Sequence, residues 1–489
     1  MKSARPCVFL SIPYGISARN VLRSEAFRIL RDNCRVVVLS PLHRDPAFRA
    51  EFGGPGVALC DLPRCRSPLY QTLRRMLDWA ESYRFTRRTR IETLLILERC
   101  FREQAPLLYA CRRAAGALLG GWDPVYRALL AVQQRSVRSR YWQDLFDEFQ
   151  PGLVLLTHPF ALEELPLALE ARLRPLLLCA MIHSWDNVTA KSGLRVVVSN
   201  RPGRTLPVRF DKLIVWNEVM RRELVDFYGY RPEDIFPSGI PQFDVYREPD
   251  RATREELLLS LGADPARRLI LYAAGSPTLL ARQEAVLDVL VEAVEEDRLD
   301  VPAQLLVRTH PGTPMEALRA RYAGRRRVVF DQPGIADAAA AFAAGWQNGD
   351  GDPRRLARQL RHCDVVVNVA STMSIDAAAF DKPVVCVGYD GDQVRPYLRS
   401  VAKHYDFTHY RNLMETGGVR LARSAEELVE EVRRYLREPG RDVEGRRRIV
   451  DQQCYRLDGR AGERIGMFLC ALLAGGAAGD ACAERMKRA

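Results

Sequence analysis

One stretch of the chain decides the fold: Asp364-Val-Val-Val-Asn-Val369, then Ala370-Ser-Thr-Met-Ser-Ile-Asp376, and finally Asp381-Lys-Pro383. The first run is apolar and has the length of a buried strand, and a helix that begins with paired hydroxyl residues follows it. A second strand, 305–307, leads directly into Arg308-Thr-His310-Pro. Because the carboxyl ends of parallel strands meet at one edge of an open sheet, we expect these polar groups to share one crevice.

The helix start at Ser371 and Thr372 suits a phosphate group. Free backbone N–H groups and the positive end of the helix dipole attract anions there, and the two hydroxyls add further donors. Asp376, one turn further on, then reaches the hydroxyls of a ribose. The alternative is an ordinary helix cap, with Asp376 in solvent. The Arg-x-His-Pro segment after the neighbouring strand favours a nucleotide diphosphate site.

The composition indicates two domains and an anionic partner. A chain of 489 residues exceeds the size at which one core keeps growing, so two domains of roughly 200 residues or more are expected. The contents of 47% apolar and 27% charged residues are ordinary for a soluble protein, and no run approaches the roughly 18 apolar residues of a membrane span. A strand follows the first residues so soon that we expect no signal peptide and a cytoplasmic location.

The net charge of +12 favours partners such as nucleotide phosphates, lipid headgroups or nucleic acid. The basic residues are spread over many helices and match no nucleic-acid recognition motif, so no nucleic acid partner is expected. The 12 cysteines contain no C-x-x-C pair, which indicates buried thiols and neither disulfides nor zinc. We expect no metal and no bound cofactor other than a nucleotide-activated substrate.

Strand and helix signals alternate twice along the chain. Continuous apolar strands separated by helices predict a parallel sheet covered on both faces, once before residue 240 and again after it. Arginine-rich helical periodicity between about 67 and 150 predicts a helical insertion. The expected fold is α/β, with two doubly wound Rossmann-like domains and a cleft between them. The expected parts are residues 1–240, residues 241–440, and C-terminal helices at 441–489 that pack back on the first domain. The strands expected in the first domain lie at 7–12, 35–40, 56–59, 152–157, 176–182, 195–199 and 212–216.

These motifs resemble glycosyltransferases of the GT-B fold, in the branch near CDP-glycerol glycerophosphotransferases and UDP-N-acetylglucosamine 2-epimerase. The resemblance is carried by Ser371, Thr372 and Asp376, by the Asp381-Lys-Pro383 that closes the segment, and by Arg308 with His310 and its proline. It is strongest over residues 236–391. It implies a GT-B fold in which the second domain binds the donor.

The resemblance also implies roles on the donor side. Arg308, His310, Ser371 and Thr372 are expected near the diphosphate, and Asp376 near the ribose. Gly275 and Ser276, after the first strand of the second domain, add backbone N–H groups and a hydroxyl, although a plain turn is the alternative there. The donor is expected to be a UDP-, CDP-, GDP- or dTDP-linked sugar, or a polyol phosphate.

The acceptor side is expected in the first domain, where His183-Ser-Trp185-Asp186-Asn187 follows a strand. Related transferases place a histidine after an equivalent strand, and His183 is expected to take a proton from an acceptor hydroxyl, with Asp186 orienting it or serving as the base. Trp185, Asn187 and the loop at Gly15 complete this side. The Ser-Trp-Asp-Asn sequence departs from the glycine-rich continuation of that branch, which leaves the acceptor and the transferred group open. A core histidine and a packing tryptophan are the alternative.

The resemblance implies a metal-independent glycosyltransferase of surface polysaccharide synthesis with a glycan or lipid-linked acceptor. A CDP-glycerol-type glycerophosphotransferase and a nucleotide-sugar epimerase are alternative enzymes, and a nucleotide-binding scaffold is the alternative without chemistry. A GT-A enzyme, holding a metal at Asp390-Gly-Asp392, is a further one. The arginines of the insertion make an anionic membrane surface a candidate partner, with a peripheral location on its inner face, whereas a solvated helical face is the plainer interpretation.

Overall fold

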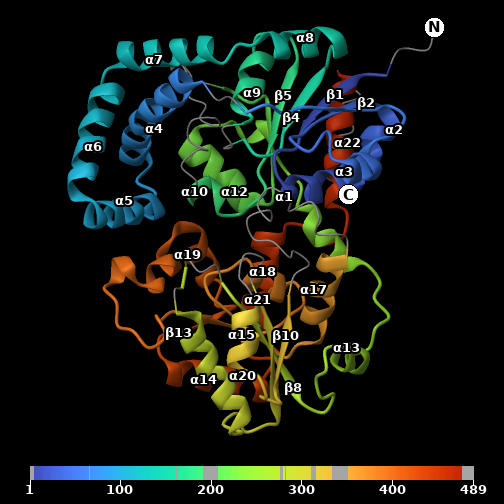
Figure 1. Cartoon of the computed structure of the whole chain (residues 1–489), viewed down its shortest axis with the longest axis vertical. Coiled ribbons are helices and arrows are strands. Elements are labelled where there is room, and N and C mark those ends of the chain that lie inside the picture. The colour runs from blue at the N-terminus through green and yellow to red at the C-terminus, as the bar shows by residue number, and fades with distance from the viewer. Residues whose placement is uncertain are drawn as a thin grey trace. The chain divides into compact units, whose positions relative to one another are not determined.

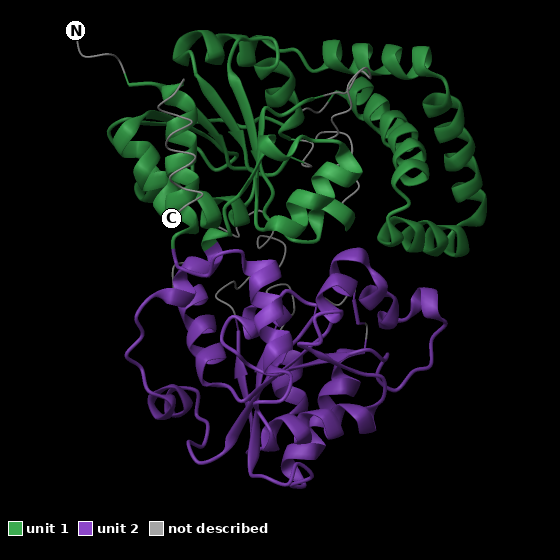
Figure 2. Ribbon diagram, turned by 180° about the vertical axis from the view of Figure 1, so that it is seen from behind, with its two compact units in different colours: residues 1–241, 460–489 green, residues 242–459 purple. Residues whose placement is uncertain are grey.

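The computed structural model describes residues 5–64, 67–159, 163–190, 208–275, 279–280, 282–309, 315–332 and 351–475. The chain divides into two compact units (Figure 2). Unit 1 contains residues 1–241 and 460–489, and unit 2 contains residues 242–459. His310, Ser276 and the strand expected at 195–199 lie outside the described residues.

Unit 1 is built on a parallel sheet of seven strands in the order β3-β2-β1-β4-β5-β6-β7 (Figure 1). Its central strands are buried runs of valine and leucine, as expected for a parallel sheet with helices on both faces. The expectation of a doubly wound fold is confirmed. The strands are β1 (Cys7–Ser11), β2 (Arg35–Leu39), β3 (Val57–Cys60), β4 (Leu153–Leu156), β5 (Leu177–Met181), β6 (Lys212–Val215) and β7 (Ile235–Pro237).

The edge strand β7 is absent from the sequence-based expectation, which treats this segment as a break. It has only three residues and ends in Pro237, too short a run to show a strand pattern. Proline is tolerated here because an edge strand has one side free of ladder hydrogen bonds. The short helices around this sheet are α1 (Gly15–Ser17), η1 (Ala18–Leu22), α2 (Glu25–Asn33), α3 (Pro46–Phe52), α9 (Leu165–Ala171), α10 (Asn187–Ala190), α12 (Glu218–Glu223), η2 (Leu224–Tyr228) and η3 (Pro232–Asp234).

The helical insertion runs between β3 and β4, as expected. Its helices α4 and α6 approach closely because Gly116 and Gly120 present no side chain: a Cβ at either would lie 2.6 or 2.7 Å from a backbone oxygen of α4. A small core of Leu77, Ala80 and Tyr126 fills the space between α4 and α7. The helices are α4 (Pro68–Thr89), α5 (Glu92–Gln104), α6 (Pro106–Gly121), α7 (Asp123–Ser136) and α8 (Arg140–Phe149).

The C-terminal helix α22 (Ala461–Ala474) belongs to unit 1, where it packs along α2 (Figure 1). Gly462 and Gly466 allow the close approach, since a Cβ at Gly466 would lie 2.9 Å from the Cβ of Ile29. The ring of Phe468 stacks on Phe236 with 4.1 Å between centroids. This helix is one part of the segment 441–489, which we expected to pack on the first domain as a whole.

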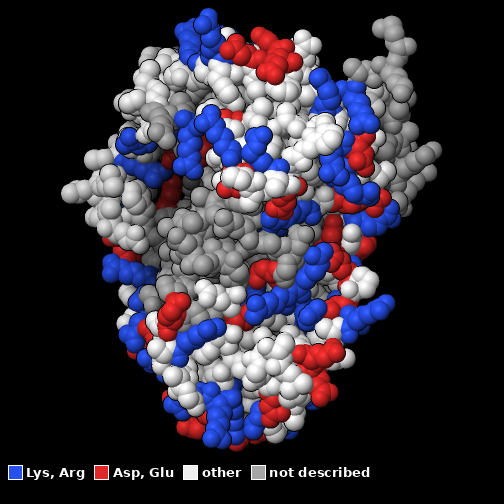
Figure 3. Space-filling model, turned by 45° about the vertical axis from the view of Figure 1, so that its right-hand side comes forward, with Lys and Arg blue, Asp and Glu red and all other residues white. Residues whose placement is uncertain are grey.

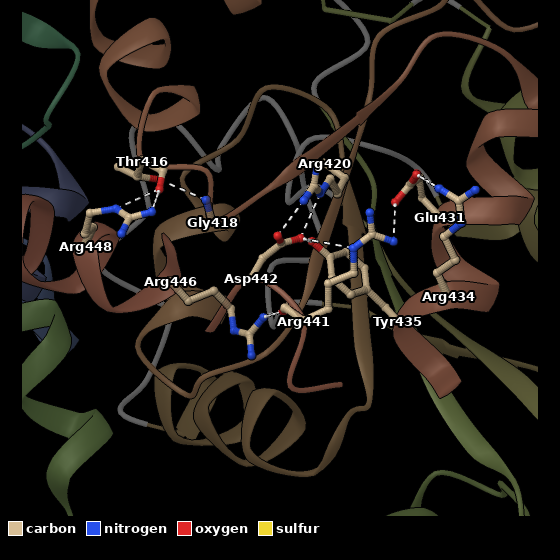
Figure 4. A network of polar contacts seen from close by, with 10 residues as sticks. All are labelled: Thr416, Gly418, Arg420, Glu431, Arg434, Tyr435, Arg441, Asp442, Arg446 and Arg448. Carbon is tan, nitrogen blue, oxygen red and sulfur yellow. Dashed lines mark hydrogen bonds and ion pairs between the residues drawn. The ribbon is translucent and has the colours of Figure 1, made fainter. Parts of the chain in front are cut away.

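The other part of that segment, α21 (Val443–Ile449) with η8 (Val450–Cys454), stays in unit 2. The backbone of Gly445 touches that of Gly417 and Gly418, so that a Cβ at Gly445 would lie 2.4 Å from the carbonyl carbon of Gly417. An ion pair of Arg420 with Asp442, which also accepts a hydrogen bond from Tyr435 at 2.8 Å, fastens β13 to α20 and α21 (Figure 4). The physical boundary therefore falls after α21 and not before it.

Unit 2 is built on a parallel sheet of six strands in the order β10-β9-β8-β11-β12-β13. The strands expected at 305–307 and 364–369 correspond to β9 and β11, and β13 was missed because it has only three residues. The helices α14 and α20 pack together over one face of the sheet, with β8, β9, β11 and β12 contributing to the same core. The strands are β8 (Arg268–Ala273), β9 (Ala303–Arg308), β10 (Val328–Asp331), β11 (Val365–Asn368), β12 (Val384–Val387) and β13 (Arg420–Ala422).

The helices of unit 2 begin at residues suited to capping. Thr253 and Glu256 form a reciprocal capping box at α13, and Ser424 accepts a hydrogen bond from the backbone of Glu427 at the start of α20. The helices are η4 (Pro241–Arg247), α13 (Arg254–Ser260), α14 (Gln283–Glu295), α15 (Met315–Arg321), α17 (Gly351–His362), α18 (Met373–Ala378), η6 (Tyr397–Arg399), η7 (Val401–Asp406), α19 (Thr408–Met414) and α20 (Ala425–Arg437).

The surface is charged and mixed in sign. On the face drawn in Figure 3, basic and acidic side chains are interleaved over both units. Within the described residues, no helix has the length and apolarity needed to cross a bilayer. The cysteines of the described residues are free thiols, most of them buried.

Candidate functional site

Each sheet contains one place where the order of its strands reverses. In unit 1 this place lies between β1 and β4, and in unit 2 between β8 and β11. Ligands of open α/β sheets bind outside the carboxyl ends of the strands at such a switch point, because the flanking loops turn away from each other there. The two switch points are therefore the two candidate sites.

In unit 2 the loop after β11 makes a sharp turn at Ala370, whose φ of +40° is unusual for a residue with a side chain. Neutral polar groups hold this turn. The backbone N–H of Ala370 donates to the Tyr405 hydroxyl at 3.0 Å, and that hydroxyl donates to the Val387 carbonyl at 2.7 Å. The buried side chain of Asn368 accepts from the Ser371 N–H at 3.4 Å. The turn is thus fixed without any charged group.

Ser371 and Thr372 are half-buried at this carboxyl end of the sheet. The Ser371 hydroxyl accepts a hydrogen bond from the Met373 N–H at 3.2 Å, which is the local contact that the capping alternative requires. Thr372 is the residue before α18 and makes no side-chain hydrogen bond to that helix. Both hydroxyls therefore lie where the diphosphate was expected, and their donor role stays a prediction.

Gly275 lies directly across the switch point from this loop. A Cβ at Gly275 would lie 3.5 Å from the Cβ of Val369, so the segments that follow β8 and β11 are in contact. Its carbonyl accepts a hydrogen bond from the side chain of Gln283, at the start of α14, at 2.8 Å. The structure thus brings Gly275, Ser371 and Thr372 to the same edge of the sheet.

Arg308 is placed differently from the expectation. Its side chain is 6% exposed, and it forms ion pairs with Asp331 at the end of β10 and with Asp352 of α17, the latter at 2.7 Å. It also donates to the Gln359 side chain at 3.3 Å. Two carboxylates already compensate its charge, so Arg308 ties β9 and β10 to α17. The structure offers no support for its expected contact with a diphosphate.

Asp376 also has a partner within unit 2. It is 6% exposed, and its carboxylate accepts a hydrogen bond from the Tyr246 hydroxyl at 2.6 Å. The side chain of Asp376 is thus engaged with η4, in the packing of α18. The expected contact with a ribose stays a prediction that this geometry does not favour.

The carboxylates of the GT-A alternative are engaged separately. Asp390 is buried and accepts a hydrogen bond from the Val401 N–H at 2.9 Å, whereas Asp392 forms an ion pair with Arg282 at 2.9 Å. In the described part of the chain, no group of three or more histidine, cysteine, aspartate or glutamate side chains has the arrangement of a metal site.

In unit 1, His183 follows β5 and is 1% exposed. Its Nδ1 lies 3.2 Å from the side-chain nitrogen of Asn20. Its Nε2 is buried and has no hydrogen-bond partner among the described residues. Burial lowers the pKa of His183 well below its usual value, and the charges of His158 and Arg19 lower it further. The imidazole is therefore neutral near pH 7.

The contact with Asn20 determines which ring nitrogen of His183 carries the proton. If the amide nitrogen donates to Nδ1, the proton of the neutral ring sits on Nε2. A half-turn of the amide instead lets its oxygen accept from Nδ1–H, which leaves Nε2 with a free lone pair. In that orientation His183 is a neutral base whose accepting atom has no other partner among the described residues.

Aromatic contacts join the loops after β1, β4 and β5. The rings of His158 and His183 stack with 6.4 Å between centroids, and the ring of Tyr14 lies 4.9 Å from that of His158. The Tyr14 hydroxyl donates to Glu163 at 3.0 Å. The sequence indicated only that the loop 13–20 and His158, which each follow a strand, would line a cleft, and the contacts of Tyr14, Asn20 and His158 described here were not expected.

Glu164 closes the switch point of unit 1 from inside. It is fully buried, and its two carboxylate oxygens accept hydrogen bonds from the backbone N–H groups of Thr157 at 3.1 Å and of His158 at 2.9 Å. Burial raises the pKa of this carboxyl to about 8, although the hydrogen bonds oppose that change. The N–H groups that an anionic ligand needs at this position are thus occupied by a side chain of the protein.

Of the remaining acceptor-side residues, Trp185, Asp186 and Asn187 lie close to His183 in the chain, whereas Gly15 follows β1. Asp186 is half-buried and accepts a hydrogen bond from the Ser184 hydroxyl, while Trp185 is 5% exposed. Asn187 is buried at the start of α10, and Gly15 is buried at the start of α1. The contact that orients His183 comes from Asn20. The assignment of Asp186 as orienting group or base stays a prediction.

Comparison with known proteins identifies one family. Residues 197–470 match the model of the CDP-glycerol:poly(glycerophosphate) glycerophosphotransferases. This match spans all of unit 2 and more than half of the chain. No curated protein sequence matches the chain significantly. His183 lies outside the matched residues, so its assignment rests on the geometry of unit 1.

Solved structures share the fold at low sequence identity. A putative UDP-N-acetylglucosamine 2-epimerase from Listeria monocytogenes has a TM-score of 0.53 and 14% identity, covering 96% of this chain and 97% of its own. The S. aureus protein MnaA, solved with UDP, has a TM-score of 0.52 and 11% identity, covering 96% and 97%. The wall teichoic acid polymerase TagF has a TM-score of 0.48 and 13% identity, covering 99% and 89%.

Proposed function

Because the chain belongs to the CDP-glycerol:poly(glycerophosphate) glycerophosphotransferase family, we propose that it transfers glycerol phosphate from CDP-glycerol to the hydroxyl end of a phosphodiester polymer. The family match over residues 197–470 carries this proposal, since it includes the whole of unit 2 and the loop of Ser371 and Thr372. The chain is thus a transferase, of the class that builds surface polymers.

The reaction joins an acceptor hydroxyl to the phosphorus that carries the glycerol. A new P–O bond forms, the P–O bond to the cytidine monophosphate breaks, and that nucleotide leaves with the bonding electrons. The proton of the acceptor hydroxyl goes to a base. In this proposal the base is Nε2 of His183, which is buried, neutral and without a partner among the described residues.

The donor belongs to the switch point of unit 2. Gly275 leaves room for the backbone to approach a phosphate, and the hydroxyls of Ser371 and Thr372 supply donors at the start of α18. No charged side chain fixes this turn, since the Tyr405 hydroxyl holds Ala370. The groups that hold this turn therefore include no carboxylate that would repel a negatively charged diphosphate.

Product analysis tests the proposal directly. The purified chain is incubated with CDP-glycerol and a short glycerol phosphate acceptor, and the nucleotide products are separated by ion-exchange chromatography. Release of CMP that depends on the acceptor supports glycerol phosphate transfer. Release of a nucleoside diphosphate from a nucleotide sugar would instead identify the glycosyl transfer alternative.

The same product analysis, with UDP-N-acetylglucosamine as the donor, addresses the epimerase alternative. For that alternative the structural likeness shows only a shared fold. Free sugar and UDP appearing from UDP-N-acetylglucosamine without any acceptor would favour it. Absence of turnover with every donor, together with tight nucleotide binding, would favour the scaffold alternative. Ser371→Ala is the matched variant, because it removes one hydroxyl at the proposed donor site and is expected to raise the KM for CDP-glycerol about tenfold.

A membrane surface is a second proposed partner, based on helix α6. This helix exposes Leu107 by 82%, Leu118 by 74% and the adjoining Trp122 by 64%. The two arginines of this helix, Arg112 and Arg113, pair with Asp78 and Glu98, so the exposed apolar side chains carry the proposal of a lipid surface. Sedimentation of the chain with anionic vesicles, but not with neutral ones, is the observation that supports this partner.

A further inference from the structure

Unit 1 contains a hollow of about 480 Å³ that the proposed chemistry does not use. The end of α7, the turn that follows it and helix α9 form its walls, and the segment just before β6 completes it (α7 and α9 in Figure 1). Its volume is in the range of pockets that hold small ligands or a short stretch of polymer. The arginine hollow, as we call it, is lined by Arg135, Arg138, Arg172 and Arg209.

Three of these guanidinium groups have no carboxylate partner in the part of the chain that the structure describes. Arg135, Arg138 and Arg209 are exposed and form no ion pair within the described residues. Arg172 differs, since it pairs with Asp211 at 2.8 Å. Glu170 also lines the hollow, but it is already paired with Arg174. The hollow is therefore positively charged, and its carboxylate does not cancel that charge.

Apart from Gln134 and Glu170, the rest of the lining is apolar and aliphatic, and it includes Leu169, Leu173 and Val208. Among the described residues that line the hollow, none is aromatic. Single-stranded nucleic acids are held by aromatic side chains on which the bases stack. A charged rim with an aliphatic wall instead suits a chain in which phosphates alternate with short carbon linkers and which carries no bases.

We propose that the arginine hollow binds an internal phosphodiester segment of the acceptor polymer, away from the end that reacts. This inference rests on the proposed function for the identity of the polymer. Each phosphate of such a chain carries one negative charge, and three uncompensated guanidinium groups hold two or three neighbouring repeats. Binding there keeps a long acceptor on the enzyme between successive transfers.

The contact with the polymer depends on salt. Binding of a polyanion to three arginines releases condensed counterions, so the logarithm of affinity falls with the logarithm of salt concentration with a slope of about −2. Monomeric glycerol phosphate has one phosphate and releases few counterions. The hollow therefore distinguishes long acceptors from short ones.

Binding of labelled poly(glycerophosphate), measured by fluorescence anisotropy at 50 and 200 mM salt, tests the proposal. The triple variant R135A, R138A, R209A is expected to bind the polymer at least about tenfold more weakly and with a smaller salt slope. The matched control is R31A, R127A, R140A, which removes the same charge from exposed arginines elsewhere in unit 1. The control is expected to bind like the wild type.

Several results would overturn the proposal. Equal affinity of the wild type and the R135A, R138A, R209A variant is one, and an equal loss in the control variant is another, since it would indicate net charge alone. Binding of oligo(dT) as tight as that of the polymer, with the same loss in the triple variant, would show that the hollow does not exclude nucleic acid. Tight binding to anionic vesicles that is lost in the triple variant would assign the hollow to lipid headgroups.

The outcome can be separated from that of the proposed function. CMP release with a one-unit acceptor does not require the hollow, so the triple variant is expected to keep the wild-type rate with that acceptor and to lose processivity with long ones. A chain that binds the polymer through these arginines but releases no CMP would leave the hollow in place and remove the transferase proposal. Matching thermal unfolding of the three proteins confirms that they are folded.

Discussion

The two switch points have the same topology, but one is closed by a titratable carboxyl and the other by a hydroxyl. In both sheets the N–H of the second residue after the strand, His158 after β4 and Ala370 after β11, donates to a side chain. In unit 1 that side chain is the carboxyl of Glu164, and in unit 2 it is the neutral hydroxyl of Tyr405. One sheet thus closes its switch point with an acidic group, and the other leaves it neutral.

This difference supports the proposal that the two units take different substrates. The Glu164 carboxyl occupies the N–H groups at the end of β4 that would bind a phosphate, and above its pKa of about 8 its charge would also repel one. The neutral turn after β11 leaves the hydroxyls of Ser371 and Thr372 beside a helix start. An anionic donor is therefore expected in unit 2, and an uncharged acceptor hydroxyl beside His183 in unit 1.

The largest effect is expected at His183. Replacement by glutamine removes the proposed base and is expected to lower kcat by about 10²- to 10⁴-fold, while the affinity for nucleotide stays unchanged. Because burial lowers the pKa of His183 below its usual 6.5, the wild-type kcat should stay level as the pH falls through 6.5 and decline only below it. Steady-state rates between pH 5 and 8 measure both.

The control for this replacement is His43→Gln, a half-buried histidine elsewhere in unit 1. It should leave kcat unchanged. If His183→Gln weakened nucleotide binding and left kcat intact, the imidazole would belong to the donor side, and the division of roles between the units would fail.

A smaller effect is expected from Glu164→Gln, and it depends on pH. The folded-state pKa of about 8 lies above the usual 4.5, so folding favours the protonated form. That stabilisation is fully present below pH 4.5 and is lost as the pH rises towards 8. Glutamine does not titrate, so the variant lacks this loss. Between pH 5 and 8 its free energy of unfolding should therefore rise relative to that of the wild type by on the order of 4 kcal/mol.

Denaturant unfolding at pH 5 and pH 8 measures this difference. The neighbouring Glu163→Gln, whose side chain is 21% exposed, is the matched control and should show a smaller change. If the difference in the free energy of unfolding between Glu164→Gln and the wild type were the same at both pH values, burial would not raise the pKa of this carboxyl.

The smallest effect is expected from Tyr405→Phe in unit 2. The change leaves the Ala370 N–H and the Val387 carbonyl without their partner, which should lower the free energy of unfolding by about 1–3 kcal/mol. Burial raises the pKa of this phenol well above 10, so the loss should be the same at pH 5 and pH 8. Thermal unfolding measures it, with the exposed Tyr397→Phe as the control.

A loss at Tyr405→Phe that changes with pH in the manner expected for Glu164→Gln would remove the contrast between the two switch points. A loss that is independent of pH would support the contrast, because the partner of the His158 N–H would then titrate in this range and the partner of the Ala370 N–H would not.

The strands and the insertion were predictable because their signals are local. Apolar runs bounded by turns marked β8, β9 and β11, and helical periodicity marked the insertion. The three-residue strands β7 and β13 were too short to show a pattern. The position of Ser371 and Thr372 followed from the strand before them, since a residue just after a strand lies at its carboxyl end.

Side-chain partners were much less predictable than positions. Arg308 was expected to bind phosphate, but Asp331 and Asp352 compensate its charge, and they lie 23 and 44 residues away in the chain. Asn20 and His183 are 163 residues apart. Contacts of this range depend on how the elements pack, which no local pattern contains.

The return of α22 to unit 1 has a consequence for the order of folding during synthesis. Residues 461–474 leave the ribosome after the whole of unit 2, yet their helix packs along α2, which was made before unit 2. Unit 2 has all of its residues earlier and can fold first, while the side of α2 that α22 covers stays open to solvent. A nascent chain that stops before α22 therefore exposes to chaperones the surface of α2, although the rest of unit 1 up to residue 241 is already made.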